Sequence, residues 1–298
     1  MNGGLLVVGD VVTDVVAVHP EPLAPATDTP ARIRTLPGGA GANAACWAAH
    51  EGLAEVGLLA RVGAESAAWH ERALAEAGVR ARLVVDPAEP TATVVSLVDG
   101  AAERTFLTDS GAALCLSPAD WAPELLDGVA HLHLSGYLFF GDTSRAAAVA
   151  ALGSARARGV PVSVDPASAG FLSGLGAERF LDAVGDAGVL LPNADEARLL
   201  AGLAPDADAG LAAAELSRRV PLVVVTLGAA GALVAEAGEV TARVPGRPAR
   251  ALDTTGAGDA FTGGFLAARL GGAGVADAAR AGCRAGAAAV GRLGGRPG

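Results

Sequence analysis

The chain has 298 residues, of which 51% are hydrophobic and 18% charged, a composition typical of a globular protein. Its formal net charge of −10 disfavours nucleic acid as a partner, because the phosphate backbone would repel it. All 22 basic residues are arginines, and the absence of lysine excludes Walker-type phosphate loops, protein kinases and Schiff-base enzymes.

The N-terminal segment MNGGLLVVGD has neither the basic start nor the small-residue cleavage site of a signal peptide. No stretch of the sequence reaches about 18 apolar residues without a charge or a helix breaker. We therefore expect a cytoplasmic protein without a membrane partner.

Apolar strands alternate with alanine-rich helices along the chain. The first strand is predicted in LLVVGDVVTDVVAV, and others follow at Val56–Ala60, Ala130–Ser135, Val160–Asp165, Gly188–Pro192 and Leu222–Leu227. Helices are predicted over Asn43–Gly52, Ser66–Ala77, Ser144–Arg158 and Asp195–Ala201. This alternation predicts an α/β fold with a parallel sheet covered on both faces.

Two segments interrupt this alternation. The first, His19–Pro37, is rich in proline and has no helical periodicity. The second, Thr91–Ser110, contains two alternating runs joined by Asp99-Gly100, which is a hairpin signal. Together they could form a small antiparallel sheet that closes over a substrate. No repeat, linker or low-complexity tail divides the chain, so we expect one domain over residues 1–298.

The most informative segment is LDTTGAGDAFTGGFLAARL, residues 252–270. Gly256, Ala257 and Gly258 directly precede a helix predicted to start near Asp259, so their N–H groups could hold an anion. Asp259 offers a carboxylate that can accept a proton. An anion hole beside a base is what phosphoryl transfer to an alcohol requires. The alternative is a plain glycine turn with Asp259 as the helix cap.

The segment PGGAGANAACWAAHEG, residues 37–52, is glycine-rich. Gly38, Gly39 and Gly41 would let the backbone approach a ligand closely. Asn43, at the start of the following helix, offers both a donor and an acceptor. The segment is not a GxGxxG fingerprint, so it is weak evidence by itself.

Two further segments carry polar or small residues after strands. In LLPNADEARLLAG, Asn193 and Glu196 could form a helix cap, or they could organise hydrated Mg²⁺ at the carboxyl end of a strand. In VVVTLGAAGALV, Thr226, Gly228 and Gly231 could line a nucleotide or form an ordinary tight turn. The residues alone leave both alternatives open.

The scattered cysteines and histidines suggest no chemistry. Cys46, Cys115 and Cys283 form no CxxC pair and are predicted to be free thiols. His131 and His133 would share one face of a strand, but no third metal ligand is near them in the sequence.

These four segments, in this order, resemble the signatures of the ribokinase-like (PfkB-type) carbohydrate kinase family. The family's N-terminal signature is similar to PGGAGANAACWAAHEGL, and its C-terminal signature is similar to DTTGAGDAFTGGFLAARL. Its Asn-x-x-Glu motif matches Asn193–Glu196, and its nucleotide-side turn matches TLGAAG. The resemblance implies a doubly wound α/β domain with a small β lid, built here from about residues 12–36 and 91–111. That lid is often also a dimer contact.

The resemblance also implies a role for each matching residue. Asp259 would be the catalytic base, and Gly256, Ala257 and Gly258 would stabilise charge on the γ-phosphate of ATP. The implied nucleotide contacts are Asn193, Thr226, Gly228 and Gly231, with Glu196 holding Mg²⁺ through water. The implied sugar contacts are Asp14, Gly39 and Asn43. Asp253 and Thr255 match a loop that binds a monovalent cation such as K⁺ in many relatives.

Departures from the family pattern concern the substrate. Val12 and Ala40 stand where ribokinases proper carry asparagine and lysine, and SGYLFFG lacks their acidic sugar contact. The aromatic residues Tyr137, Phe139 and Phe140 could pack near a base or a sugar ring, or simply in the core. The leading hypothesis is therefore an ATP-dependent kinase for a small uncharged sugar. The alternatives are a nucleoside kinase of the adenosine, inosine or pseudouridine type, a phosphosugar kinase, and a ligand-binding relative without catalysis.

Overall fold

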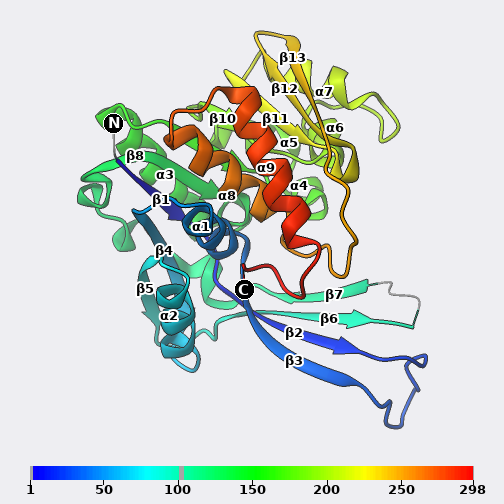
Figure 1. Cartoon of the computed structure of the whole chain (residues 1–298). Helices are drawn as coiled ribbons and strands as arrows, with labels where there is room; N and C mark the ends of the chain where they lie inside the picture. The colour runs from blue at the N-terminus through cyan, green and yellow to red at the C-terminus, as the bar shows by residue number, and fades with distance from the viewer. Residues whose placement is uncertain (1–2, 101–103, 298) are drawn as a thin grey trace.

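Two β-sheets organise the molecule (Figure 1). This computed structural model describes residues 3–100 and 104–297. The strands of the large sheet are β1 (Gly4–Val8), β4 (Val56–Gly63), β5 (Arg80–Asp86), β8 (Val129–Ser135), β9 (Val162–Asp165), β10 (Val189–Leu190), β11 (Leu222–Thr226), β12 (Gly231–Glu236) and β13 (Glu239–Pro245). The strands of the small sheet are β2 (Val12–Val18), β3 (Arg32–Gly38), β6 (Ala92–Val98) and β7 (Arg104–Asp109).

Helices connect most strands of the large sheet. They are α1 (Ala40–His50), α2 (Ala67–Glu76), α3 (Asp142–Arg158), α4 (Ala169–Leu175), α5 (Ala177–Ala183), α6 (Ala194–Leu200), α7 (Ala209–Leu216), α8 (Ala257–Leu270) and α9 (Val275–Ala289). Short 3₁₀ turns include η1 (Gly111–Cys115), η4 (Gly136–Phe140) and η5 (Gly228–Ala230). Within the described residues, no helix is both long and apolar enough to span a bilayer.

The large sheet has the strand order β13-β12-β11-β10-β9-β8-β1-β4-β5. Its pairs from β11 to β5 are parallel, and β12 and β13 add an antiparallel edge. The chain runs from β1 outward to β4 and β5, then returns to β8 and continues in the other direction. The order therefore reverses between β1 and β8. In sheets of this kind, ligands bind outside the carboxyl ends of the strands at such a reversal.

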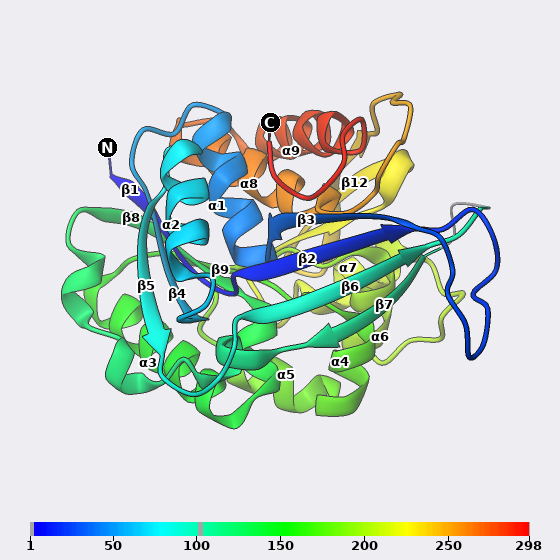
Figure 2. The same ribbon diagram turned by 90° about the horizontal axis from the view of Figure 1, so that it is seen from below.

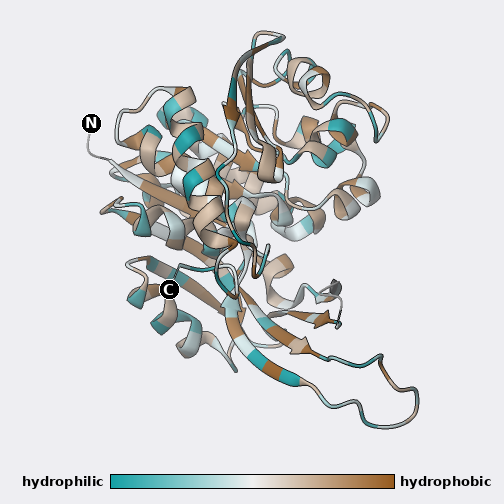
Figure 3. Cartoon of the chain, turned by 45° about the vertical axis from the view of Figure 1, so that its right-hand side comes forward, coloured by the Kyte–Doolittle hydropathy of each residue, from teal (hydrophilic) through white to brown (hydrophobic). Residues whose placement is uncertain are grey.

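Both faces of the large sheet are covered by helices (Figures 1 and 2). Because side chains alternate along a strand, Leu5 and Val7 of β1 point into a core shared with α1, α8 and α9. Leu6 and Val8 point into the opposite core, shared with α3, α6 and α7. Figure 3 shows hydrophobic residues concentrated in the strands between these layers. The predicted doubly wound α/β fold is confirmed.

The small sheet projects from the carboxyl end of the large one (Figures 1 and 2). Its order is β3-β2-β6-β7, with antiparallel pairs β2–β3 and β6–β7 joined by a parallel β2–β6 pair. β3, β6 and β7 come essentially from the two segments that interrupt the alternation, whereas β2 comes from the segment predicted as the first strand and falls only within the range 12–36 that the family resemblance implied. The antiparallel pairing of β6 with β7 confirms the predicted hairpin. Its turn was predicted at Asp99-Gly100, directly after β6, and residues 101–103 that follow lie outside the described residues.

The predicted first strand is in fact two strands. β1 belongs to the large sheet and β2 to the small one, because the chain turns at Gly9 and Asp10 between them. A side chain at Gly9 would press on the backbone of Gly41, so glycine permits the close approach of α1 at this point. The sequence also gave no prediction for β5, β13 or α9.

Candidate active site

A cavity of about 480 Å³ lies between the carboxyl ends of the large sheet and the small sheet. Carboxylates dominate its polar lining: Asp10, Asp14, Asp109, Asp165, Glu196 and Asp259. Among the described residues, no arginine or histidine lines it. The cavity therefore suits a ligand that is neutral or that carries a cation.

Most of the predicted site residues line this one cavity, although they come from five segments of the sequence. Those on its wall are Asp14, Gly39, Asn43, Asn193, Glu196, Thr226, Thr255, Gly256, Gly258 and Asp259. Those that lie off its wall are Ala257, Gly228, Gly231 and Asp253. The structure thus brings together the residues predicted for base, sugar and nucleotide contacts.

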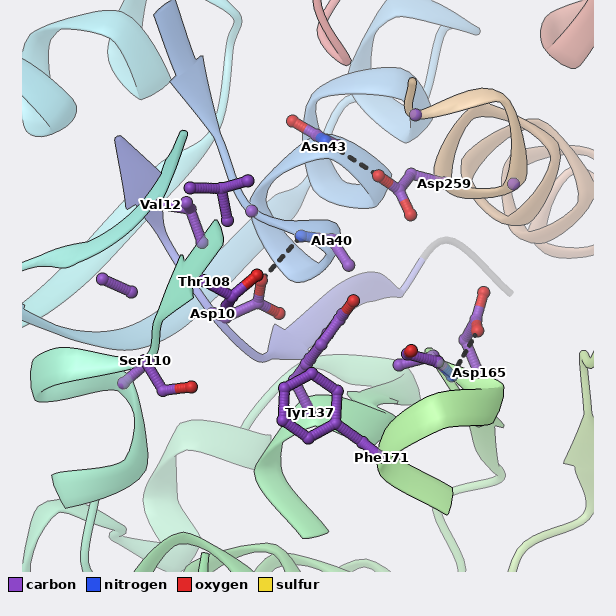
Figure 4. Close-up of a pocket in the computed structure, with 18 of the residues that line it drawn as sticks. Asp10, Val12, Ala40, Asn43, Thr108, Ser110, Tyr137, Asp165, Phe171 and Asp259 are labelled. Atoms are coloured by element: carbon purple, nitrogen blue, oxygen red, sulfur yellow. Dashed lines mark hydrogen bonds between the residues drawn. The ribbon is translucent and has the colours of Figure 1, made fainter. Parts of the chain in front are cut away.

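Asp259 lies in the first turn of α8, where the N–H groups of a helix point toward ligands. Its Oδ2 accepts a hydrogen bond from Asn43 Nδ2 at 2.7 Å, which fixes the carboxyl group across the cavity from α1 (Figure 4). Gly256 caps α8 with a φ of 73°, and a side chain there would clash with Gly295. The turn therefore requires glycine on steric grounds. The N–H of Ala257 donates to Thr254 O at 3.3 Å.

Burial raises the pKa of Asp259 to about 8, and the nearby carboxylates of Asp165, Asp10 and Asp14 add to the effect, while the Asn43 hydrogen bond opposes it. Such a carboxyl group holds a proton at neutral pH and is well matched to exchanging one.

Asp14, on β2 of the small sheet, shows a similar perturbation. Burial is the largest cause that raises the pKa of Asp14 to about 7, and the nearby Asp10 raises it further, while Arg296 opposes the shift.

Asp10 is a site residue that the sequence analysis missed. Its carboxylate accepts hydrogen bonds from Ala40 N at 2.8 Å, Gly41 N at 3.2 Å and Ser135 Oγ at 2.7 Å (Figure 4). Asp10, which follows β1, thereby satisfies the first N–H groups of α1 and also binds Ser135 at the end of β8, the strand next to β1 at the reversal. Its position directly after an apolar strand was the available signal.

Asn193 and Glu196 form the capping box that was one of the two predicted alternatives. Asn193 Oδ1 accepts from the N–H groups of Asp195 and Glu196, both at 3.0 Å, and Glu196 Oε2 accepts from Asn193 N at 2.9 Å. Both residues also line the cavity, so the cap places their polar groups at its edge.

Asp165, at the end of β9, is a second missed site residue. It lies on the cavity wall, and Thr262 Oγ1 donates to its Oδ2 at 3.2 Å. Burial raises the pKa of both Asp165 and Glu196, and the charge of Asp165 raises that of Glu196 further. A cation bound beside these two carboxyl groups would favour their ionised forms.

The residues between β11 and β12 differ in their surroundings: some lie at the cavity and one is needed for strand packing. Thr226 lies on the cavity wall, and Gly228, in η5, has open space around its Cα. Gly231 has a φ of 105°, and a side chain there would clash with the carbonyl group of Val244 on β13. Gly231 is therefore required by strand packing and lies away from the cavity.

The loop before α8 is bound to the C-terminal segment. Asp253 Oδ1 accepts from Thr255 N at 2.7 Å, and its Oδ2 accepts from Gly294 N at 3.0 Å. Trp47 Nε1 donates to Gly295 O at 2.8 Å. The segment around Gly294 thus connects α1, the Asp253 loop and the turn at Gly256, which packs against Gly295.

Arg296 lies behind Asp14 and was not predicted from the sequence. Its Nη2 donates to Gly38 O at 3.0 Å, and Gly38 packs directly against the Asp14 carboxylate. Among the described residues, its buried Nε and Nη1 have no hydrogen-bond partner. Burial lowers the pKa of Arg296, and Cys46 and Asp14 oppose that shift.

The aromatic segment after β8 divides between the core and the site. Phe139 is fully buried and packs on Phe180, as the core interpretation predicted. Tyr137 and Phe140 line the cavity, together with Phe171 from α4, which the sequence analysis missed. Figure 4 shows Tyr137 and Phe171 next to each other on the cavity wall.

The remaining histidines and cysteines lie outside the site. His131 Nε2 and His133 Nδ1 both hydrogen-bond to Ser163 Oγ at 2.9 Å. No cluster of three potential metal ligands is found in the part of the chain that the structure describes. Cys46, Cys115 and Cys283 are free thiols, as predicted.

Comparison with known proteins gives consistent results. The model of the pfkB family carbohydrate kinases matches residues 3–298. A fructokinase from Klebsiella pneumoniae is 33% identical over 274 residues, covering 90% of this chain and 84% of the relative. An E. coli protein assigned as a ribokinase II, solved with ATP and Mg²⁺, superposes with a TM-score of 0.84 at 26% identity, covering 98% of this chain and 94% of that one. Adenosine kinase from Sinorhizobium meliloti shares the fold, with a TM-score of 0.87 at 22% identity over 100% of this chain and 96% of that one.

Proposed function

The chain belongs to the pfkB family of carbohydrate kinases, and we propose that it transfers the γ-phosphoryl group of ATP to a hydroxyl group of an unphosphorylated sugar. The observation that carries this proposal is the Asp259–Asn43 pair at the N-terminus of α8, facing Asp14 in the same cavity. A relative that only binds its ligand would not need a base beside an anion-binding turn.

Asp259 acts as the general base. Its carboxylate takes the proton of the acceptor hydroxyl while the hydroxyl oxygen bonds to the γ-phosphorus, and the bond from that phosphorus to the β-phosphate oxygen breaks to release ADP. Asn43 holds Oδ2 of Asp259, so the other oxygen is turned toward the acceptor. Positioning of this kind supplies much of the rate enhancement in phosphoryl transfer.

The turn Gly256–Gly258 provides the anion hole. Backbone N–H groups at the start of α8, together with the positive end of the helix dipole, stabilise negative charge on the γ-phosphoryl oxygens. Because glycine at position 256 lets the turn pack against Gly295, these N–H groups stay fixed before the reaction begins.

Mg²⁺ fits the neighbouring carboxyl groups of Asp165 and Glu196, which both line the cavity and supply the oxygen ligands that Mg²⁺ prefers. These residues would hold it through water and the ATP phosphates, where it neutralises phosphate charge. Asn193 would orient the same phosphates. Thr226 and Gly228 would contact the nucleotide, and Gly231 shapes the turn that presents them.

A monovalent cation such as K⁺ would lie at the loop of Asp253 and Thr255. Both oxygens of the Asp253 carboxylate accept backbone N–H groups, so backbone carbonyl groups would supply its ligands. Activity measured in K⁺ and in a large organic cation tests this part of the proposal.

The small sheet acts as the lid. Its inner face carries Asp14, which would bind acceptor hydroxyl groups together with Asn43 and the backbone near Gly39.

The outer face of the lid is apolar. Val15, Val95 and Leu107 lie side by side across three strands, with Ile33 on the same face, and Leu107 and Ile33 are 58% and 66% exposed. We propose that this face forms a homodimer contact. A monomer mass by light scattering would contradict it.

Acceptor-dependent ADP release tests the function. Wild-type protein is incubated with Mg·ATP and K⁺ and with each of a panel of sugars and nucleosides. Release that depends on one class of acceptor supports the proposal, whereas no release with any acceptor contradicts it.

A further inference from the structure

Aromatic side chains from three segments line the cavity. Phe140 and Phe171 are stacked, with ring centroids 5.2 Å apart and an interplanar angle of 21°. Tyr137 meets both edge-on, at 5.9 Å and 5.8 Å. Phe106 of the lid strand β7 lines the same cavity from the opposite side. We call these four residues the aromatic wall.

The aromatic wall is not a closed piece of the core. Phe171 is 37% exposed and Phe106 is 53% exposed, although aromatic side chains gain stability mainly from burial. Phe139, from the same segment as Tyr137 and Phe140, differs from them because it is fully buried in the core against Phe180. The exposed rings therefore present a surface that a flat ligand could cover.

The register of the lid fixes the spacing between this surface and the sugar contacts. Asp14 lies in one cross-strand row with Val94 and Thr108, and the next row on the same face contains Ser96 and Phe106. Such rows are about 7 Å apart, since a strand rises about 3.4 Å per residue. A sugar ring held at Asp14 would thus place a directly attached second ring beside Phe106.

The charges of the cavity restrict what that second ring can be. No described arginine or histidine lines the cavity, whereas the carboxyl groups of Asp10, Asp14 and Asp165 do. A phosphate or carboxylate on the acceptor would meet no cation there and would be repelled. A neutral or cationic heteroaromatic ring is not repelled by these carboxyl groups.

Given the kinase function proposed above, we propose that the acceptor is of the nucleoside class: an unphosphorylated sugar bearing a planar, neutral or cationic heteroaromatic base. Its sugar binds at Asp14, Asn43 and Asp259, and its base is held between Phe171 and Phe106. Tyr137 forms the edge of this slot.

The test compares kcat/KM for ADP release with adenosine, inosine, cytidine, uridine and pseudouridine against D-ribose and D-fructose. At least one nucleoside is expected to exceed both free sugars by about 100-fold. Phe171→Ala and Phe106→Ala are expected to lower the ratio of nucleoside to free-sugar kcat/KM at least tenfold, mainly through KM. Thr105→Ala, on the outer face of the same strand and outside both the cavity wall and the residues named for the dimer contact, is the control and should leave this ratio unchanged.

The possible outcomes test the nucleoside class of the acceptor separately from the proposed kinase function. Faster turnover of free sugars than of every nucleoside overturns the inference and leaves the kinase intact. An equal loss for all acceptors in Phe171→Ala and Phe106→Ala also overturns it, because an aromatic cluster that only seals the closed lid would act in that way. If no acceptor is phosphorylated, calorimetric titration of the nucleosides decides: binding supports the ligand class while the kinase function fails, and no binding contradicts both.

Discussion

Replacement of Asp259 by asparagine separates the base from the binding site. Asparagine has nearly the shape of aspartate, and its carbonyl oxygen can accept the hydrogen bond from Asn43 Nδ2 that Asp259 Oδ2 now accepts at 2.7 Å. The anion-binding turn and the cap at Gly256 do not depend on the carboxylate. The variant should therefore fold and bind both substrates but lack the group that takes the proton.

A general base contributes about 10²- to 10⁴-fold to a rate. Each factor of ten corresponds to about 1.4 kcal/mol of activation free energy, so this range is roughly 3 to 5 kcal/mol. Because Asp259 is fixed by Asn43 and faces the acceptor contacts directly, we expect a loss of about 10³-fold in kcat with KM for both substrates changed less than about threefold.

The Asp259 carboxyl group also makes the stability of the folded protein depend on pH. Its pKa of about 8 in the folded protein exceeds that of an unfolded aspartate, so the folded state binds its proton more tightly and loses stability as pH rises from about 4 to about 8. In Asp259→Asn this contribution is absent. The Tm of the variant should fall less between pH 5 and pH 8 than that of the wild type.

The assay is coupled ADP release at saturating Mg·ATP, with a thermal melt at each pH. Asp109→Asn is the matched control, since Asp109 is another cavity carboxylate but is exposed and has no role in the proposed mechanism. We expect its kcat to stay within about threefold of wild type. A kcat for Asp259→Asn within tenfold of wild type would refute the assignment of the base.

Three further predictions follow from the surroundings of the base. Because the pKa values of Asp14 and Asp259 are raised to about 7 and about 8 and both act as carboxylates, kcat/KM for the acceptor should rise from pH 6 to pH 8.5; a flat profile would contradict this. Arg296→Gln should raise the acceptor KM about tenfold with a smaller effect on kcat, and higher pH should partly lower this KM again, since Arg296 opposes the rise in the pKa of Asp14. Arg296→Lys should recover part of the loss, whereas equal effects on KM and kcat would favour a purely structural role. Gly256→Ala should destabilise the fold by about 2 kcal/mol in denaturant titration, because φ is 73° and the added carbon clashes with Gly295; an unchanged midpoint would show that the turn relaxes.

Local sequence signals were sufficient for much of the site. The turn at Gly256–Gly258, the position of Asp259 in the first turn of α8 and the Asn193–Glu196 cap each depend on residues close together in the chain, so their pattern is visible in the sequence. The hairpin of β6 and β7 was visible for the same reason.

The residues that the sequence analysis missed owe their roles to long-range packing. Asp10 and Asp165 end two different strands, and only the order of the sheet brings both to one cavity. Phe171 lies in a short helix without distinctive periodicity, and Arg296 reaches Gly38 across 258 positions of sequence. Gly231 is required by strand packing, and its contact with a nucleotide stays a prediction, because strand packing and ligand approach both select glycine and sequence does not distinguish them.

The central claim is that this protein moves a phosphoryl group from ATP to a hydroxyl group through Asp259. The most direct measurement follows ATP labelled in its γ-phosphoryl group, with Mg²⁺, K⁺ and an acceptor, in wild type and Asp259→Asn side by side. The account predicts label on the acceptor with wild type and about 10³-fold slower labelling with the variant. Label that appears only in inorganic phosphate, or equally fast on the acceptor with both proteins, would contradict it.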